Sequence, residues 1–263
     1  MNHEDLILRD AATGFVVDAH LAPASGDIGP ALAAMSAIES GSIANAHEQR
    51  QVGHYWLRAP LLAPTPELTV QIQDALRSIR AIDATGMDAV LQIGFGGSAL
   101  GPDLVIDALR KPDARRFILI DTVDPAGLTE ILRSVDPKRT LVIAASKSGL
   151  TPETRTALRV VEAEFASSGA CFADQAIAVT GLNSPLAELS KSWKLTLPIW
   201  DWVGGRTSVC SPVGLTAMHL CGIDIDAFIG GAAAMDEWTR TPPPNTAPTH
   251  TLWGVCGRRG HWV

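Results

Sequence analysis

Two loops of this chain gather the residue types that bind phosphate groups in proteins. The first, at residues 93–102, reads IGFGGSALGP, and the second, at residues 146–154, reads SKSGLTPET. Each loop follows an apolar run typical of a buried strand and precedes a pattern of helical period. Backbone N–H groups at the start of a helix lack intrahelical acceptors, and the helix dipole favours negative charge there. The two loops therefore predict a phosphorylated small molecule as the ligand.

The first loop offers glycines that let a ligand approach the backbone closely, followed by Ser98 at the N-cap or in the first turn of a helix. Its spacing, G-x-G-G-S, differs from the dinucleotide fingerprint G-x-G-x-x-G, although Asp121 could hold a ribose about twenty residues further on. Two alternatives stay open for this loop alone. One is an oxidoreductase that uses a nicotinamide cofactor, and the other is a tight structural turn closed by a capping serine.

The second loop is more specific, because Ser146, Ser148 and Thr151 supply three hydroxyls and Lys147 supplies a cation. An ordinary N-cap would explain one hydroxyl but not three together with a lysine. Charge-assisted hydrogen bonds contribute roughly 1.5–3 kcal/mol each, so such a loop could hold a phosphate even in an acidic protein. The arrangement favours a phosphate monoester over a dinucleotide.

A third motif, at residues 201–208, reads DWVGGRTS and follows another strand pattern. Its two glycines bend the chain and present Arg206 at the carboxyl end of that strand, where a guanidinium could stabilise a developing anion. His219 lies on an apolar helical pattern, and we interpret it as a packed histidine rather than a catalyst.

The elements that would position these loops alternate regularly between strand and helix. Strands are predicted at residues 89–93, 117–121, 140–145, 175–180 and 195–199. Helices are predicted from Pro66 to about residue 84 and at residues 98–109, 125–135, 151–167, 184–190, 208–221 and 225–239. Strands that are apolar on both faces and alternate with helices indicate an α/β fold, a three-layer αβα sandwich with a five-stranded parallel doubly wound sheet. In the order 2-1-3-4-5, the strands before the two phosphate loops are neighbours at the point where the winding reverses, which is where ligands bind.

The remaining segments flank this domain, which we place at residues 67–240. Residues 1–66 are predicted to be a helical lead-in, with a helical pattern at residues 28–47. Residues 241–263 begin with the breaker run TPPPNTAP and are predicted to be an aberrant or disordered tail. The sequence does not distinguish a truncated gene product from a frameshifted end.

Composition excludes several classes of function. The formal net charge of −7 argues against a general affinity for nucleic acid. The four cysteines show no C-x-x-C spacing, so we expect reduced thiols, no metal site and no redox pair. The first residues contain no signal-peptide pattern, and no run approaches the roughly 20 apolar residues of a membrane helix. We therefore expect a cytoplasmic protein without a membrane partner.

Three separated segments, in the same order, resemble the glucose-6-phosphate isomerase family. They are residues 94–102, residues 145–154 and residues 203–208, and Asp124-Pro125 and Ser184-Pro185-Leu186 add shorter matches. The resemblance covers about residues 50–240 and implies a sugar-isomerase domain that binds a hexose phosphate without metal or nucleotide. It implies that Arg206 steadies an enediolate and that two copies of the chain pair across the site. The residues that it places around the phosphate are Gly97, Ser98, Ser146, Lys147, Ser148 and Thr151.

The chain also departs from the family. Its second loop keeps only some of the hydroxyls of the family loop, which reads Ser-Lys-Thr and continues with two further threonines. Family members continue into a second sugar-isomerase domain that carries a glutamate base, a ring-opening histidine and a lysine, and the glutamate motif is absent from this sequence. Glu153 matches a family glutamate that does not transfer the proton. We expect the N-terminal half of such an isomerase, of the kind also found fused behind a transaldolase, and weak or no activity alone. The alternative is a sugar-phosphate sensor without catalysis.

Overall fold

The structure is a computed structural model that describes residues 4–9, 16–21, 29–45 and 47–240. The chain forms two compact units. One consists of residues 38–229 and contains all three motifs, and the other takes the described residues up to Ala37 and from Gly230 onward.

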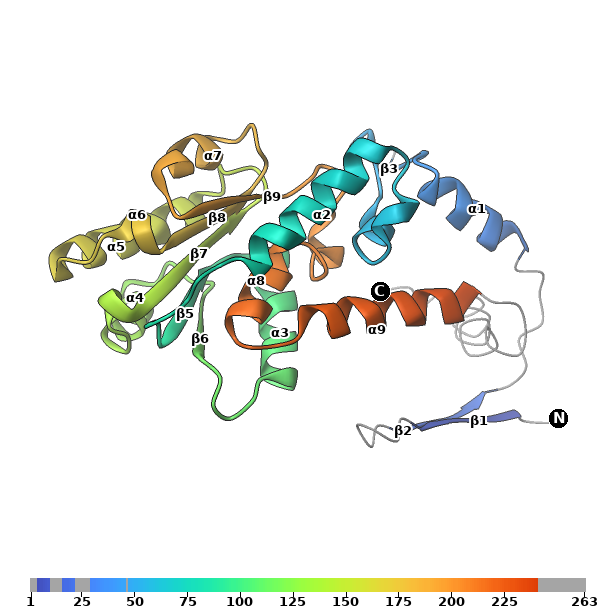
Figure 1. The fold of residues 1–263 in the computed structure, drawn as a ribbon, viewed down its shortest axis with the longest axis horizontal. Coiled ribbons are helices and arrows are strands. Elements are labelled where there is room, and N and C mark those ends of the chain that lie inside the picture. Colours follow the sequence, from blue (N-terminus) through green and yellow to red (C-terminus); the bar gives the residue numbers. More distant parts are fainter. Residues whose placement is uncertain (1–3, 10–15, 22–28, 46, 241–263) are drawn as a thin grey trace. The chain divides into compact units, whose positions relative to one another are not determined.

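The larger unit is built on a five-stranded parallel sheet with the order β6-β5-β7-β8-β9. The strands are β5 (Ala89–Ile93), β6 (Arg116–Ile120), β7 (Thr140–Ser146), β8 (Ala176–Thr180) and β9 (Leu195–Pro198). This is the predicted order 2-1-3-4-5, and each strand lies within one residue of its predicted bounds. The predicted fold class is therefore confirmed (Figure 1).

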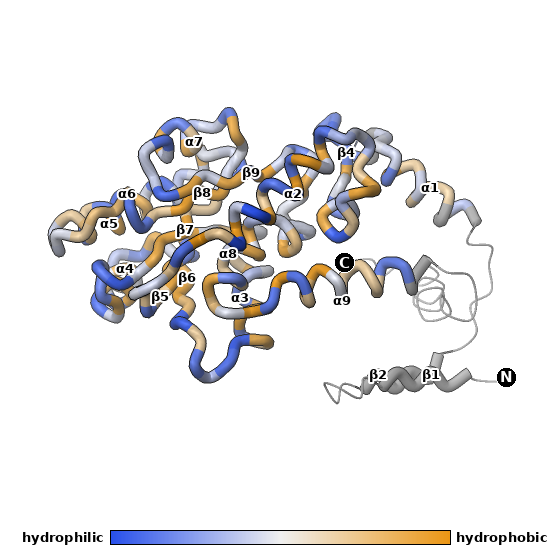
Figure 2. Tube along the Cα trace, viewed as in Figure 1, coloured by the Kyte–Doolittle hydropathy of each residue, from blue (hydrophilic) through white to orange (hydrophobic). Residues whose placement is uncertain are grey.

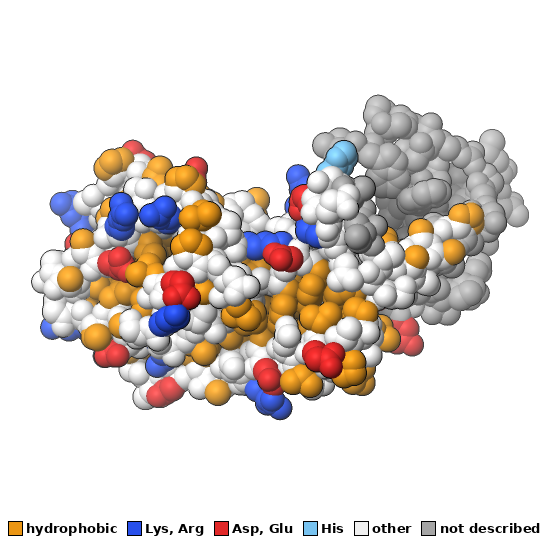
Figure 3. Space-filling view, turned by 90° about the horizontal axis from the view of Figure 1, so that it is seen from above, with side chains coloured by type: hydrophobic (Ala, Val, Ile, Leu, Met, Phe, Trp, Pro, Cys, Tyr) orange, Lys and Arg blue, Asp and Glu red, His pale blue; other side chains and the backbone are white. Residues whose placement is uncertain are grey.

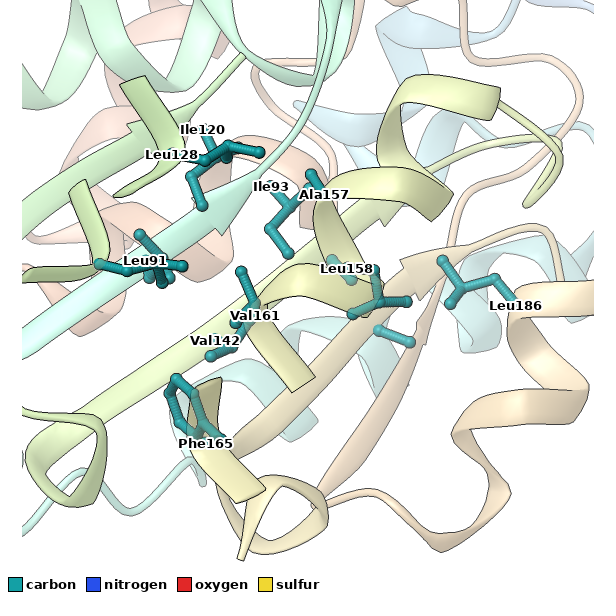
Figure 4. Packing of buried hydrophobic residues seen from close by; sticks show 13 residues of the cluster. Leu91, Ile93, Ile120, Leu128, Val142, Ala157, Leu158, Val161, Phe165 and Leu186 are labelled. Carbon is teal, nitrogen blue, oxygen red and sulfur yellow. The ribbon is translucent and has the colours of Figure 1, made fainter. Parts of the chain in front are cut away.

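Burial on both faces explains why these segments form parallel strands. Every residue of β5, β7 and β8 is buried, and β7 and β8 are drawn in hydrophobic colours in Figure 2. On one face, Leu91 and Ile93 pack with Val142 against α4 (Pro125–Arg133) and α5 (Pro152–Ser168) (Figure 4). Successive strand side chains point to opposite faces, so the intervening residues must be covered from the other side.

The opposite face is covered by α2 (Pro66–Arg80), α3 (Leu100–Leu109) and α8 (Pro212–Leu220). The helix α8 lies centrally, because both α2 and α3 contact it and it contacts β5. Helices on both faces complete the predicted three layers.

The predicted helices are all present, with differences at their ends. Besides those already named, they are α7 (Pro185–Leu189) and α9 (Ile225–Arg240), and a short helix that was not predicted, α6 (Phe172–Gln175). The helix α3 begins two residues later than predicted because Gly96–Ser98 forms a 3-10 turn, so Ser98 does not cap it. The helix α8 begins at Pro212 because Gly205–Thr207 forms another 3-10 turn and Ser211 is the N-cap.

The N-terminal segment is only partly helical. The helix α1 (Gly29–Glu39) lies where a helical pattern was predicted, but β1 (Glu4–Arg9) pairs antiparallel with β2 (Val16–Leu21), and no strand was predicted there. Two further short strands, β3 (Ile43–Asn45) and β4 (Arg50–Gln51), pair before α2. The domain boundaries at residues 66 and 240 stay predictions, and the tail at residues 241–263 lies outside the described residues.

Two findings bear on the predictions from composition. Across the described residues, no helix has both the length and the apolarity needed to span a membrane. Three cysteines are free thiols, exposed at Cys171 and buried at Cys210 and Cys221, while Cys256 lies outside the described residues. Burial raises the pKa of Cys221 to about 11, which makes it a poor nucleophile at neutral pH.

The half-buried His219 predicts a pH dependence of stability. Burial, reinforced by Arg115 and Arg80 and opposed by Asp226, lowers its pKa below the usual 6.5. The unfolded chain therefore binds a proton at higher pH than the folded chain, so stability is lost as pH falls through 6.5. In urea unfolding at pH 7 and pH 5, the native chain should lose more free energy of unfolding than His219→Gln. Equal losses in the two proteins would show that His219 does not contribute.

Candidate phosphate site

The two phosphate loops lie at the same edge of the sheet. The strands β5 and β7 are adjacent and parallel, with Ile93 opposite Ala144, and the loops leave their carboxyl ends. This is the edge at which the sequence predicts both loops, where the winding of the sheet reverses.

The glycine loop is packed directly against the loop that carries Arg206. A Cβ atom on Gly97 would lie 2.5 Å from Gly205 Cα and 2.6 Å from its carbonyl carbon and oxygen. The Ser208 hydroxyl shares its one proton between the carbonyl oxygens of Gly97, at 2.9 Å, and of Gly205, at 2.8 Å. The first and third motifs, more than a hundred residues apart in sequence, therefore form one backbone surface.

The second loop arranges its hydroxyls around the start of α5. The Ser146 and Thr151 hydroxyl oxygens are 3.0 Å apart, and the Gly149 N–H donates to Ser146 Oγ at 3.2 Å. Thr151 is the N-cap of α5, yet its side chain makes no capping hydrogen bond. The hydroxyl of Thr151 is thus not used for capping. Ser146 is buried under the loop, whereas Ser148 is exposed and Thr151 partly exposed, so the latter two hydroxyls are the ones open to a ligand.

Lys147 connects the second loop to the third. Its ammonium group donates to the backbone oxygens of Asp201, at 2.6 Å, and Val203, at 3.0 Å. Burial lowers the pKa of Lys147, and the positive charge of Arg50 lowers it further, while Asp201 and Glu48 act in the opposite direction. The sequence predicted that this cation would face the phosphate. The structure places two of its three donors on backbone carbonyls, which leaves one donor and the backbone N–H for a ligand.

Arg206 is exposed, and within the described ranges its side chain has no hydrogen bond or ion pair. A second guanidinium, that of Arg50, lies near the same loop, with a nitrogen 3.7 Å from the position of a Cβ atom on Gly204. It is ion-paired with Glu48. Sequence reasoning missed Arg50 because it precedes the first predicted strand and belongs to no phosphate-loop pattern.

The charges on the face shown in Figure 3 do not favour anions in general. On the face shown in Figure 3, lysine and arginine side chains lie interspersed with aspartate and glutamate. An anion would therefore be selected by the local arrangement of hydroxyls, N–H groups and cations at the carboxyl edge. Among the residues that the structure covers, no group of three or more His, Cys, Asp or Glu side chains could hold a metal ion.

Lys147→Met tests the connection between the two loops. The substitution removes the ammonium group and leaves two backbone carbonyls without their charged donor. This should lower the free energy of unfolding by about 1.5–3 kcal/mol. The matched control is Lys138→Met, at an exposed lysine at the opposite end of β7, which should change stability by less than about 0.5 kcal/mol. Both are measured by urea unfolding. If the two variants had the same stability, the bridge to Asp201 and Val203 would contribute nothing.

Fold and site together define the class of this protein. It is an α/β protein with a doubly wound parallel sheet and a candidate phosphate site, assembled from three loops at the carboxyl edge of that sheet. The sequence model of the family described as phosphoglucose isomerase matches residues 33–255. The chain belongs to this family.

Individual relatives agree with the family assignment. A glucose-6-phosphate isomerase of Synechococcus elongatus is 48% identical over 227 residues, which cover 80% of this chain and 43% of that protein. The crystal structure of a glucose-6-phosphate isomerase from Chlamydia trachomatis superposes with a TM-score of 0.73 at 28% identity, covering 84% of this chain and 47% of that one. The crystal structure of a hypothetical protein from Thermus thermophilus superposes with a TM-score of 0.71 at 29% identity, covering 89% of this chain and 54% of that one. The chain thus spans about half the length of the relatives it matches.

Proposed function

We propose that this chain binds a hexose phosphate as the sugar-phosphate-binding part of a glucose-6-phosphate isomerase. The observation that carries the proposal is the convergence of three loops at one edge of the sheet, with Gly97 against Gly205 and Lys147 reaching Val203. Relatives named glucose-6-phosphate isomerase support the identity of the sugar. The second loop gathers its hydroxyls and a lysine at one place, which suits a single phosphate group. This favours a phosphate monoester over a dinucleotide.

The residues have different roles in the proposed site. The phosphate is held by Gly97, Ser98, Ser146, Lys147, Ser148 and Thr151. In this set, Ser148 and Thr151 donate their hydroxyls, whereas Ser146 holds Thr151 in place from below. Lys147 contributes its charge and its backbone N–H, since its ammonium is largely occupied by the third loop.

Arg206 is proposed to stabilise the anion that forms during isomerisation. Aldose–ketose isomerisation takes a proton from carbon 2 of the sugar and returns it to carbon 1, through an enediolate that carries negative charge. The side chain of Arg206 is exposed and not engaged by another described residue, so it is available for this charge.

The proton transfer itself needs a base that the motif-matched residues do not include. The residues assigned to the phosphate and to the anion are glycine, serine, threonine, lysine and arginine, and the matched Glu153 corresponds to a family glutamate that does not transfer the proton. We therefore place the base outside this set and propose that the chain alone binds substrate with little or no turnover. We further propose a cytoplasmic location, and the resemblance suggests that two copies of the chain pair and that no metal is used.

The experiment is a calorimetric titration with fructose 6-phosphate, run beside a coupled isomerase assay on the same preparation. The native chain should bind with micromolar to millimolar affinity, and Ser148→Ala/Thr151→Ala should bind at least about tenfold more weakly. Ser167→Ala, near the far end of α5, is the control and should bind like the native chain. Equal binding by the double variant would refute the site, and turnover by the native chain would refute the placement of the base.

A further inference from the structure

A buried glutamine lies beneath the glycine loop and takes part in none of the motifs. Gln92 is the fourth of the five residues of β5 and has no exposed surface. Its neighbours on the adjacent strands are Leu119 and Ile143, and the preceding and following residues of β5 are Leu91 and Ile93. A polar side chain in such apolar surroundings costs stability unless its polar atoms are paired.

Gln92 is only half paired. Its amide nitrogen donates to the carbonyl oxygen of Ser98 at 2.7 Å, whereas its Oε1 has no partner among the described residues. An apolar residue would avoid the cost of burying that oxygen. The position of this glutamine is therefore better explained by what it does to Ser98 than by packing of the sheet.

The carbonyl of Ser98 is turned inward by this contact. A Cβ atom on Gly94 would lie 2.3 Å from the Ser98 oxygen, so the oxygen sits directly over a residue that must be glycine. The neighbouring carbonyl, that of Gly97, is likewise held by the Ser208 hydroxyl at 2.9 Å. Two consecutive carbonyl oxygens are thus tied to side chains from β5 and from the third loop.

The remaining carbonyls of the turn are occupied within it. The Ser98 N–H donates to the oxygen of Phe95 at 3.2 Å, and the Ala99 N–H donates to that of Gly96 at 3.0 Å. By contrast, the N–H groups of Gly96 and Gly97, which open the 3-10 turn, have no acceptor within the described part of the chain. A loop whose carbonyls are all engaged and whose N–H groups are open presents only positive dipole ends to an anion.

We propose that Gln92 is a positioning residue, which holds the Ser98 carbonyl inward so that the N–H groups of Gly96 and Gly97 stay open for the substrate phosphate. Ser208 acts in the same way on Gly97. The inference rests on the proposed function for the identity of the ligand, but the geometry of the turn is independent of it. Without Gln92, the Ser98 carbonyl would be free to rotate toward the anion and repel it.

The test compares two glutamines that make similar contacts at opposite ends of the sheet. Gln92→Met removes the donor at nearly constant volume, and Gln175→Met is the matched control. Gln175 is also buried, and its amide nitrogen donates to the carbonyl oxygens of Pro137, at 2.7 Å, and Thr140, at 2.8 Å. Both variants leave carbonyls without a donor, so both should be destabilised in urea unfolding.

Only the Gln92 variant should lose ligand affinity. We expect Gln92→Met to bind fructose 6-phosphate on the order of tenfold more weakly than the native chain, and Gln175→Met to bind equally well. The carbonyl ¹³C resonance of Ser98 should move upfield in Gln92→Met alone. The proposal would be overturned if Gln92→Met bound fructose 6-phosphate with native affinity, or if both variants lost the same amount of affinity. An unchanged Ser98 carbonyl resonance in Gln92→Met would also overturn it.

A titration with inorganic phosphate separates this inference from the proposed function. If the native chain did not bind fructose 6-phosphate but phosphate shifted the amide resonances of Gly96 and Gly97 in the native chain and not in Gln92→Met, the sugar assignment would be wrong and the inference would hold. If the native chain bound fructose 6-phosphate but neither fructose 6-phosphate nor phosphate shifted these two amides, the inference would be overturned and the proposed function would stand.

Discussion

Replacing Gly97 by alanine should abolish most of the ligand binding of this chain and destabilise its fold. The added methyl group would lie 2.5–2.6 Å from three backbone atoms of Gly205, and a backbone cannot move aside as a flexible side chain can. The methyl group therefore overpacks the site and forces the two loops apart. This should lower the free energy of unfolding by about 1–3 kcal/mol. Displacing the phosphate-binding groups by about 1 Å should weaken fructose 6-phosphate binding on the order of a hundredfold.

The neighbouring glycine supplies the control for this prediction. A Cβ atom on Gly204 would be 3.4 Å from Thr207 Oγ1 and 3.7 Å from the guanidinium of Arg50, which are ordinary contacts, and its φ of −81° suits any residue. Gly204→Ala should therefore change stability by less than about 0.5 kcal/mol. Calorimetry and urea unfolding on both variants check the prediction. If Gly97→Ala were as stable and bound as well as the native chain, the close approach of the two loops would not exist in solution.

Phe165→Ala should produce the largest loss of stability. Phe165 is fully buried on α5, where it packs in the core between that helix and the sheet (Figure 4). Its ring meets that of Phe172 edge-on, with the ring centroids 5.5 Å apart. Removing a buried phenylalanine typically costs about 3–5 kcal/mol, a large fraction of the roughly 5–15 kcal/mol that stabilises a domain.

Val160→Ala, on the same helix, is the matched control because its side chain is 39% exposed. It should cost less than about 1 kcal/mol. Chemical denaturation monitored by circular dichroism measures both variants. A loss below about 1 kcal/mol for Phe165→Ala would mean that α5 is not held by this core, and the position of the second phosphate loop would then lack its support.

The sheet could be predicted from sequence because its strands are apolar on both faces and separated by helical patterns. For β5 and β7 this pattern predicts that both phosphate loops leave the same edge of the sheet, and they do. The first residues of α3 and α8 were harder to predict from sequence, because the 3-10 turns that precede these helices depend on the packing of Gly97 against Gly205. No local pattern in the chain encodes that contact.

The partners of polar side chains were the least predictable part of the site. Lys147 was expected to face the phosphate, but its ammonium bridges to carbonyls more than fifty residues away. In the sequence, Gln92 is an isolated polar residue in a predicted strand. Its contact with Ser98 depends on how the turn folds back over β5. Arg50 lies in a segment with no strong periodicity, so only the tertiary structure brings it near Gly204. Residue types indicated the chemistry, whereas the assignment of donors to acceptors required the fold.

The most direct test of the proposed site is a crystal structure of the chain with fructose 6-phosphate bound. We expect the phosphate to lie within hydrogen-bonding distance of the Ser148 and Thr151 hydroxyls and of the Gly97 N–H, with Arg206 directed toward the sugar. A phosphate bound away from these three loops would contradict it.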